Sequence, residues 1–367
     1  MLGVVMKSKE RVIRALTFNK PDHIPVFDFP FYDVFSFDNL PPKSWQPSEK
    51  NLYPHLLTPV IRTWGLYRWK RPAWAPKDWW NYKREEIDQW GCYWINGGRD
   101  DLSMGHPGRP AIDTFDKVES WEGPDTADKN VYKFMARFSK FFPRKYKVAV
   151  IHDIIFIFDR VSMLRGFENF LKDHFKNPSQ LHQLIDKVTD LFLKNVEMLL
   201  TEFKPDGIWA CDDLGSQQGP FLSPDLFKKF YAGPYKKITD YVHDHNATFH
   251  LHCCGNIGPL IPTLIESGVD ALEFDSPRNS GFDELVKYRG KFPFWACVNI
   301  QTVYPRGTPE EVEQEVKEMI RTFSTQEGGF LANFYSDPGV IGVPKRNIKA
   351  FHAALKKWGN YPLKWLS

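Results

Sequence analysis

The sequence contains little cysteine and no long hydrophobic run. Its 367 residues include only 5 cysteines, of which Cys253 and Cys254 are adjacent, so they do not make the framework of a disulfide-rich protein. The apolar start, Met1 to Met6, is shorter than a secretory signal. No stretch approaches the roughly 20 apolar residues of a membrane helix. We therefore expect a cytoplasmic protein with reduced thiols and no membrane partner.

The signatures of several functional classes are also missing. Lysine and arginine are spread along the chain, whose net charge is +3, whereas a nucleic-acid partner would require a concentrated basic face. There is no G-x-G-x-x-G after the first expected strand, no phosphate-binding glycine loop, no nucleophile elbow and no kinase motif. Asp-x-His-x-x-Gly, which supplies a lower ligand to protein-bound cobalamin, is absent too. A small-molecule substrate is the expected partner, and association into homo-oligomers is left open.

Aromatic residues, in contrast, are abundant, at 16% of the chain with 13 tryptophans. Between residues 38 and 130 the alternation of strands and helices disappears, and such stretches are usually functional insertions or caps. We read residues 38–130 as an insertion or cap on a single domain of residues 1–367. The cap is either structural or a lid that offers ring surfaces to an aromatic or tetrapyrrole ligand. Its tryptophans are Trp64, Trp69, Trp74, Trp79, Trp80, Trp90 and Trp94.

Strand and helix patterns alternate in the rest of the chain. After a helix at Ser8–Leu16, strands are expected at 23–28, 148–151, 154–157, 208–211, 248–253, 271–274, 294–298 and 328–333. Helices are expected at 177–203, 224–245, 257–267, 282–288, 309–323 and 344–358, with a capping box of Thr308 and Glu311. This alternation favours parallel strands with right-handed crossovers, and about eight units predict a closed (β/α)8 TIM-type barrel. A doubly wound open sheet is the alternative.

Polar residues follow two neighbouring strands where each strand ends. Asp212 and Asp213 come after the strand at 208–211, and a His-Cys-Cys run ends the strand at 248–253. In α/β barrels the C-terminal ends of the strands form the ligand site. One carboxylate would cap the following loop while the other binds substrate or acts as acid or base; capping by both is the structural alternative. We take Asp212 and Asp213 as the candidate catalytic residues.

His252 and Cys254 are the candidate metal ligands. Residues separated by one position point to the same face of a strand, and imidazole with thiolate suits zinc. Cys297, at the end of a later strand, is the candidate third ligand, while Glu273 and Asp275 offer oxygen atoms. The alternative is a buried cysteine and a hydrogen-bonded histidine beside a tight glycine turn.

Four further residues are candidates for binding the substrate. Arg160 flanks an apolar segment and would hold a carboxylate by bidentate contact, or else would begin a solvated helix. Trp209 lies within a strand, where it would either fill the barrel or face the ligand. Asn333 and Tyr335 stand at the end of the last expected strand.

Several motifs occur along the chain in a characteristic order. They are Glu10-Arg11-Val12, Pro21-Asp22-His23-Ile24-Pro25-Val26, Gly207-Ile208, Asp212-Asp213-Leu214-Gly215, Ser223-Pro224, His252-Cys253-Cys254-Gly255-Asn256, Glu266-Ser267-Gly268-Val269-Asp270-Ala271-Leu272, Gly328-Gly329 and Val343-Pro344-Lys345-Arg346-Asn347-Ile348. In this combination the chain resembles the uroporphyrinogen decarboxylase superfamily over residues 10–34 and 148–361. The resemblance implies a (β/α)8 barrel with its site at the C-terminal mouth of the strands.

The resemblance also separates two chemistries. True uroporphyrinogen decarboxylases carry Arg-Gln-Ala-Gly-Arg-Tyr after the first strand, whose arginines hold propionates; residues 27–33 here read Phe-Asp-Phe-Pro-Phe-Tyr-Asp, without arginine. The chain is more similar to the corrinoid-linked methyltransferases, in which a His-x-Cys pair and a distant cysteine bind zinc and a methyl group moves to or from cobalt on a separate corrinoid protein. His252 and Cys254 match the pair, but Val340 stands where the distant cysteine is expected.

Three functions are therefore considered. The first is a methyltransferase component, assisted by zinc, that moves a methyl group from a small methylated compound, for instance an aryl methyl ether, to a separate corrinoid protein. A cofactor-free decarboxylase or other lyase is the alternative within the same superfamily. A barrel that only binds a ligand is the alternative outside catalysis.

Overall fold

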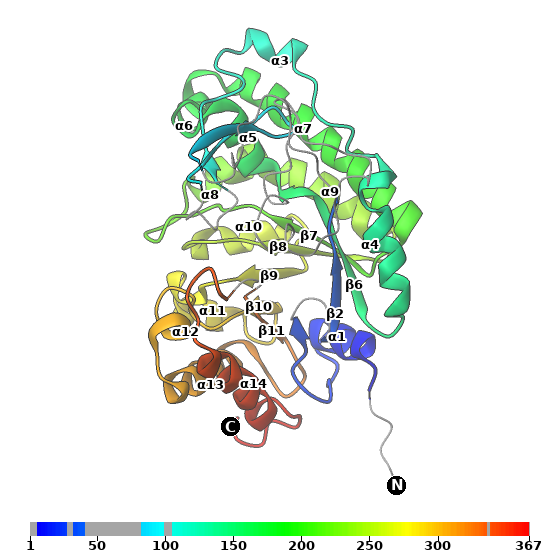
Figure 1. Ribbon diagram of the computed structural model, residues 1–367, viewed down its shortest axis with the longest axis vertical. Coiled ribbons are helices and arrows are strands. Elements are labelled where there is room, and N and C mark those ends of the chain that lie inside the picture. The colour runs from blue at the N-terminus through cyan, green and yellow to red at the C-terminus, as the bar shows by residue number, and fades with distance from the viewer. Residues whose placement is uncertain (1–5, 28–31, 41–81, 99–104, 336–337, 367) are drawn as a thin grey trace.

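Eight parallel strands form the central sheet of the protein (Figure 1). The computed structural model describes residues 6–27, 32–40, 82–98, 105–335 and 338–366. The strand order is β1-β11-β10-β9-β8-β7-β6-β2 and every neighbouring pair is parallel. The strands are β1 Val26–Phe27, β2 Val34–Phe37, β6 Tyr146–Ile155, β7 Gly207–Cys211, β8 Thr248–His252, β9 Ala271–Phe274, β10 Phe294–Ala296 and β11 Phe330–Asn333. The predicted (β/α)8 TIM-type barrel is confirmed, with its ring nearly closed.

Helices follow most strands and lie on the outer face of the sheet (Figure 1). The capping box of Thr308 and Glu311 is formed at the start of α13 as predicted. No described helix is both long and apolar enough to cross a membrane. The α-helices are α1 Ser8–Leu16, α3 Asp116–Ser120, α4 Lys133–Phe138, α5 Ile157–Arg165, α6 Phe167–Lys176, α7 Pro178–Met198, α8 Pro224–Phe227, α9 Gly233–Asp244, α10 Ile261–Glu266, α11 Phe282–Leu285, α12 Val303–Arg306, α13 Pro309–Phe323 and α14 Lys345–Trp358.

Two hydrophobic clusters show that side chains alternate between the two faces of the barrel wall. The inner cluster joins Trp295 and Leu331 of the wall to Val12 and Ala15 of α1. Because α1 contributes to this inner cluster, it closes the N-terminal end of the barrel. The outer cluster contains Phe249 and the buried faces of the surrounding helices. The N-terminal end of the barrel is therefore filled by apolar side chains, which leaves the C-terminal end of the strands for polar residues.

Strand β6 differs from the prediction of two short strands at 148–151 and 154–157. It is one strand of 10 residues, and Ile157 already belongs to α5. Asp153 and Ile154 adopt left-handed backbone conformations, with φ of 64° and 66°, and the register with β7 shifts between Val150 and Ile155. The polar interruption in the sequence thus marks a bulge within one strand, not a break between two.

Strand β2 was not predicted. Its four residues are all buried, and they adjoin the aromatic-rich stretch in which the sequence shows no alternation of strands and helices. Val34 of β2 pairs with Tyr146 of β6, and β2 supplies the eighth strand of the barrel. The predicted count of eight was right only because one strand was counted twice and another was missed.

The described part of the predicted cap contains a small antiparallel sheet. Its strands are β3 Arg84–Ile87, β4 Tyr93–Asn96 and β5 His106–Pro107. Trp90 and Trp94 are 0% and 4% exposed, and the Trp94 indole donates to Asp88 Oδ2 at 2.9 Å, so these two rings are structural. The other five tryptophans of the cap lie outside the described residues, and the extent of the cap and the single-domain reading stay predictions.

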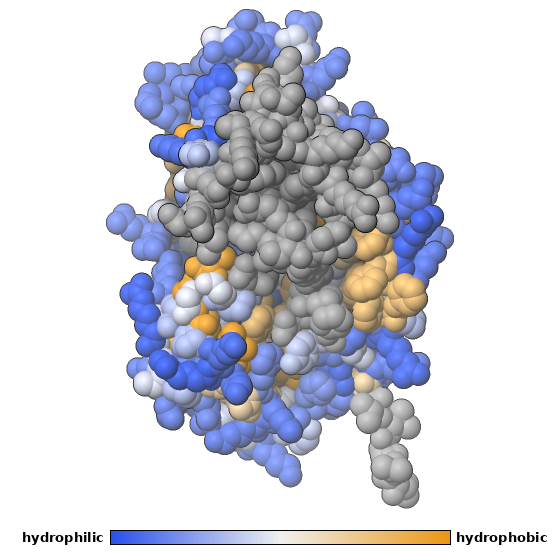
Figure 2. Space-filling view, viewed as in Figure 1, coloured by the Kyte–Doolittle hydropathy of each residue, from blue (hydrophilic) through white to orange (hydrophobic). Residues whose placement is uncertain are grey.

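A hydrophobic patch lies on the face shown in Figure 2, at the edge where Figure 1 places α4. Phe134 is 42% and Phe141 77% exposed, and both rings contact the ring of Phe138. The rest of the described surface on this face is mostly hydrophilic (Figure 2).

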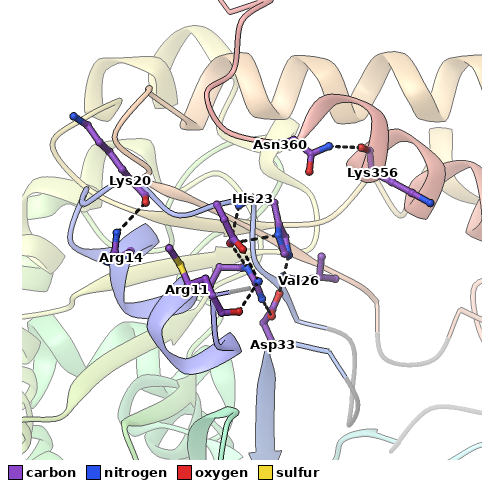
Figure 3. A network of polar contacts seen from close by, with 10 residues as sticks. Arg11, Arg14, Lys20, His23, Val26, Asp33, Lys356 and Asn360 are labelled. Carbon is purple, nitrogen blue, oxygen red and sulfur yellow. Dashed lines mark hydrogen bonds and ion pairs between the residues drawn. The ribbon is translucent and has the colours of Figure 1, made fainter. Parts of the chain in front are cut away.

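Arg11 ties together the two strands that end the sheet order (Figure 3). Its Nε lies 2.6 Å from Asp22 Oδ1 and its Nη1 lies 2.5 Å from Asp33 Oδ1. Asp33 Oδ2 accepts from the backbone N–H of Val26 in β1 at 3.0 Å, and the Asp33 N–H donates to the Val26 carbonyl at 3.0 Å. Arg11 and Asp33 are each 5% exposed. This ionic clamp therefore connects α1, the start of β1 and the approach to β2 where the strand ladder is open.

Replacing Arg11 by methionine is expected to lower the free energy of unfolding by about 3 kcal/mol, because the buried Asp33 carboxylate loses its partner. Arg14→Met on the same helix is the matched control: Arg14 pairs with Glu10 at side-chain exposures of 36% and 49%, and the expected change is within about 0.5 kcal/mol. Urea denaturation measures both variants. Equal losses would contradict the clamp.

A second prediction concerns acid stability. Burial and the nearby Arg11 cation lower the pKa of His23, against the opposing effect of the Asp22 and Asp33 carboxylates. Below about pH 6.5 the unfolded chain binds a proton at His23 that the folded chain does not, so stability falls as the pH falls. His23→Gln is expected to flatten this decline in the free energy of unfolding between about pH 7 and 5, and the exposed His106 gives the control variant His106→Gln. An unchanged slope for His23→Gln would show the prediction to be wrong.

Candidate metal centre

The strand register places the candidate residues in two layers at the C-terminal end of the barrel. Cys211 pairs with His252 across β7 and β8, and His252 pairs with Glu273 across β8 and β9. Paired residues of adjacent strands share a face, so these three side chains lie side by side inside the barrel. Asp213, Cys254 and Asp275 lie two positions further along the same three segments and form the second layer.

His252 is held from both sides. Its Nδ1 lies 2.6 Å from Glu273 Oε2 and its Nε2 lies 3.3 Å from Cys254 Sγ. Asn333, at the end of β11, donates from Nδ2 to Glu273 Oε1, so the carboxylate is itself fixed. Glu273 and Asn333 are 2% and 6% exposed. A histidine whose Nδ1–H is bonded to a carboxylate presents Nε2 as a ligand in a fixed direction.

Two overlapping sets of ligand atoms surround this imidazole. One set is His252, Cys254 and Asp275, and the other is Cys211, Asp213 and His252; within each set the ligand atoms lie within 4.8 Å of one another. Tetrahedral zinc, with Zn–N and Zn–S bonds of about 2.0 and 2.3 Å, would separate nitrogen and sulfur by roughly 3.5 Å. The observed separation of His252 Nε2 and Cys254 Sγ is 3.3 Å. The chemistry and spacing of these donors fit a zinc ion.

Cys297, the predicted third ligand, lies beside this group. Its Sγ donates to the backbone carbonyl of Asp275 at 3.2 Å and lies 3.9 Å from Asp275 Oδ1. Among the residues that the structure describes, it belongs to neither set of ligand atoms. Its role as a ligand stays a prediction.

Burial sets the ionisation of the site. Burial lowers the pKa of His252, but the Glu273 carboxylate and the thiols of Cys211 and Cys254 outweigh it, and the pKa stands well above its ordinary value. Burial raises the pKa of Asp275 to about 7, with His252 opposing. Burial likewise raises the pKa of the Cys254 thiol, again against His252. A bound divalent cation would favour the charged, ligating forms of both acids.

Asp212 is part of the structure beneath the site. It is fully buried, and its carboxylate accepts hydrogen bonds from the backbone N–H groups of Phe158 at 2.9 Å and Asp159 at 2.8 Å. The Tyr235 hydroxyl also donates to it, at 2.5 Å. Burial raises the pKa of Asp212 to about 7, while these donors oppose the rise. Asp212 therefore caps the N-terminus of α5, a helix that precedes it in the chain, whereas the predicted cap was on the loop that follows it.

Asp213 is the member of the pair that reaches the site. Its side chain is 46% exposed, and its Oδ1 lies 3.9 Å from His252 Nε2. The same oxygen accepts from the Cys254 N–H at 2.8 Å, and the Asp213 N–H donates to Asp159 Oδ2 at 2.6 Å. Asp213 is thus anchored by its backbone while its carboxylate faces the imidazole.

Arg160 is committed to the interior of the protein. It is 1% exposed, its Nη1 lies 2.8 Å from Asp88 Oδ2, and its guanidinium stacks 4.6 Å from the centre of the Trp90 ring. Arg160 therefore does not begin a solvated helix, and its guanidinium does not face solvent, where it could bind a substrate carboxylate. Its ion pair joins the small antiparallel sheet to α5.

The other three predicted substrate residues have varied surroundings. The Trp209 ring lies 5.7 Å from the His252 ring, centre to centre, beside the inner cluster. Asn333 supports Glu273, whereas Tyr335 is half-buried against the outer cluster. Direct contact of these residues with a substrate stays a prediction.

Two residues of the site were missed in the sequence. Cys211 lies two positions before Asp213 and so shares its face, a signal that the sequence offered. Asp159 offered none, since it comes from the start of α5. Burial, together with the neighbouring Asp212 and Asp213, raises the pKa of Asp159 well above its ordinary value.

Comparison with known proteins identifies the family. The model of the uroporphyrinogen decarboxylase (URO-D) family matches residues 103–358. The chain belongs to this family, as its motifs suggested.

Two proteins of Methanosarcina mazei are similar to the chain. A methylated-thiol–coenzyme M methyltransferase is 22% identical over 207 residues, which are 53% of this chain and 49% of that protein. The chain thus spans about half the length of this curated relative. A solved structure described as a methyltransferase from the same organism superposes with a TM-score of 0.60 at 18% identity, covering 96% of this chain and 99% of the other. The structural likeness shows a shared fold.

The different surroundings of the two aspartates predict different costs of substitution. Asp212→Ala is expected to lower the free energy of unfolding by about 2–3 kcal/mol, because the α5 N-terminus and the Tyr235 hydroxyl lose their acceptor. Asp213→Ala removes a half-exposed carboxylate that accepts from the Cys254 N–H at 2.8 Å and from the Cys211 thiol at 4.0 Å, and it is expected to cost about 1 kcal/mol or less. Chemical denaturation of both variants tests the assignment, which fails if the order of the two losses is reversed.

Proposed function

We propose that the chain is a methyltransferase component that moves a methyl group from a small methylated compound, aryl methyl ethers included, to a corrinoid on a separate protein. Zinc, held by His252 and Cys254, assists the transfer. The observation that supports this most directly is the imidazole of His252, which Glu273 fixes at 2.6 Å so that Nε2 faces Cys254 Sγ at 3.3 Å. The printed names of the two similar Methanosarcina mazei proteins agree with methyl transfer.

Each residue of the site has a distinct part in this chemistry. Zinc, when bound, polarises the oxygen or sulfur atom that carries the methyl group. Glu273 keeps the proton of His252 on Nδ1 and so reserves Nε2 for the metal. Asp213, half-exposed and 3.9 Å from Nε2, holds or returns the proton of the demethylated atom.

A cofactor-free decarboxylase is the alternative, and the described surroundings disfavour it. Such a reaction needs cationic anchors for substrate carboxylates, but Arg160 is paired with Asp88 in the interior. The groups nearest His252 include the acids Asp213 and Asp275, which would repel a polycarboxylate.

Adjacent cysteines allow a matched experiment. Cys253 is fully buried in the outer cluster, where its Sγ accepts from the Leu214 N–H at 3.3 Å, while Cys254 faces His252. The wild type and Cys253→Ser are expected to retain about one zinc per chain after purification without chelator, and His252→Ala and Cys254→Ser to lose it. Methyl transfer from a panel of aryl methyl ethers to cob(I)alamin, followed by absorbance, is expected to fall at least about 100-fold in the latter two.

Three outcomes would contradict the proposal. Equal, sub-stoichiometric amounts of zinc in the wild type and in His252→Ala would show that His252 does not bind a metal. Release of CO2 from a carboxylated pyrrole without any corrinoid would favour the decarboxylase. Tight binding of a ligand with no turnover in any variant would indicate a barrel without catalysis.

A further inference from the structure

The segment after β11 does not supply the cysteine that would complete a His-Cys-Cys zinc site. Val340 stands at that place and is 38% exposed. A catalytic zinc needs three protein ligands and one open position. His252 and Cys254 provide two of the three, so another residue of this chain must provide the last one.

We propose that Asp275 is the third ligand, which gives the metal one nitrogen, one sulfur and one oxygen donor from β8 and the end of β9. This inference rests on the proposed function, because it requires that a metal is bound at His252. It assigns a residue of this chain to a place where the sequence pattern leads one to expect a second thiolate.

The first support is positional. Among the residues that the structure describes, Asp275 is the one carboxylate that shares a set with both His252 and Cys254, and the three ligand atoms lie within 4.8 Å of one another. The three donors are therefore close enough together to be candidates for one ion. Asp213 and Cys211 share a set with His252, but in the described residues that set does not include Cys254.

The second support is that the Asp275 carboxylate has little other use. Among the described residues, its one side-chain donor is the Cys297 thiol, 3.9 Å from Oδ1. Asp213, by comparison, accepts the Cys254 N–H at 2.8 Å, and Glu273 binds both His252 and Asn333. A carboxylate within the fold is normally paired with hydrogen-bond donors or a cation, and a zinc ion at His252 would satisfy this requirement for Asp275.

The competing thiols have weaker positions. Cys297 is 1% exposed, and its Sγ is directed to backbone carbonyls of Asp275 and Val298 at 3.2 and 3.4 Å. Cys211 lies in the first layer, where it pairs in register with His252, whereas Cys254 and Asp275 both lie in the second layer. Asp213, whose Oδ1 lies 3.9 Å from His252 Nε2 and whose side chain is 46% exposed, lies on the exposed side of the site.

The donor set has a chemical consequence for the substrate. When a carboxylate replaces one thiolate, the bound metal has more hard Lewis-acid character. A harder Lewis acid favours oxygen over sulfur ligands. The site is therefore suited to a methyl group carried on oxygen, as in an ether or alcohol, more than to one carried on sulfur.

Cobalt(II) in place of zinc tests the ligand assignment, because thiolate-to-cobalt charge transfer in the near ultraviolet reports the thiolates bound. One cobalt per chain and one thiolate are expected in the wild type. Cys254→Ser is expected to abolish the band, while Cys211→Ser and Cys297→Ser leave it unchanged. Asp275→Cys supplies a second thiolate and is expected to about double the band.

Zinc affinity, measured by competition with a chelator, gives an independent reading. Asp275→Asn keeps the shape but removes the charge, and it is expected to weaken zinc binding at least about 10-fold. Asp213→Asn is the matched control, with an expected loss of less than about 3-fold.

The outcomes separate this inference from the proposed function. If the wild type binds neither zinc nor cobalt, both fail together. If it binds one metal but Asp275→Asn retains full affinity, or if Cys211→Ser or Cys297→Ser halves the band, the third ligand is another residue and only this inference is overturned. Binding of two metals per chain would also overturn it.

Discussion

The hydrogen bond between Glu273 and His252 is the interaction on which the candidate site depends. It requires β8 and β9 to pair in one register, because a shift by one residue would turn one of the two side chains out of the barrel. Asn333 adds a third strand by binding the other oxygen of Glu273. The ligand direction of the imidazole is therefore a property of the barrel wall and not of a loop, which gives a metal centre the rigid support that such centres need.

Much of the fold could be predicted because long amphipathic helices and short apolar strands have clear periods. The helices at Ser8–Leu16 and Pro309–Phe323 begin where the sequence indicated. Periodicity failed at β2, which adjoins the aromatic-rich stretch in which the alternation of strands and helices disappears. It failed again in β6, where a polar pair interrupts an apolar run without ending the strand.

The site was predictable in part for the same reason. His252 and Cys254 follow from the two-residue period of a strand, and their nearness in space bears out that spacing. Arg160 and Asp212 could not be placed, because the sequence does not reveal their partners: Asp88 is 72 residues from Arg160, and Phe158 is 54 residues from Asp212. Charged residues are attractive candidates for chemistry, yet many of them serve buried pairs and helix caps.

The bulge in β6 has a consequence for how the protein is held together around its mouth. Ile154, a β-branched residue, is kept in the left-handed backbone region at a cost of about 1–3 kcal/mol, beside Asp153, a residue type that tolerates this region better. The kink carries the chain to Phe156, whose N–H meets the Cys211 carbonyl at 2.7 Å, and so lets α5 start directly above Asp212. Backbone strain in β6 is thus tolerated because it allows α5 to begin beside the end of β7. If β6 relaxed to a regular strand, α5 would shift, and Asp159 of α5 could no longer hold the backbone of Asp213 in place.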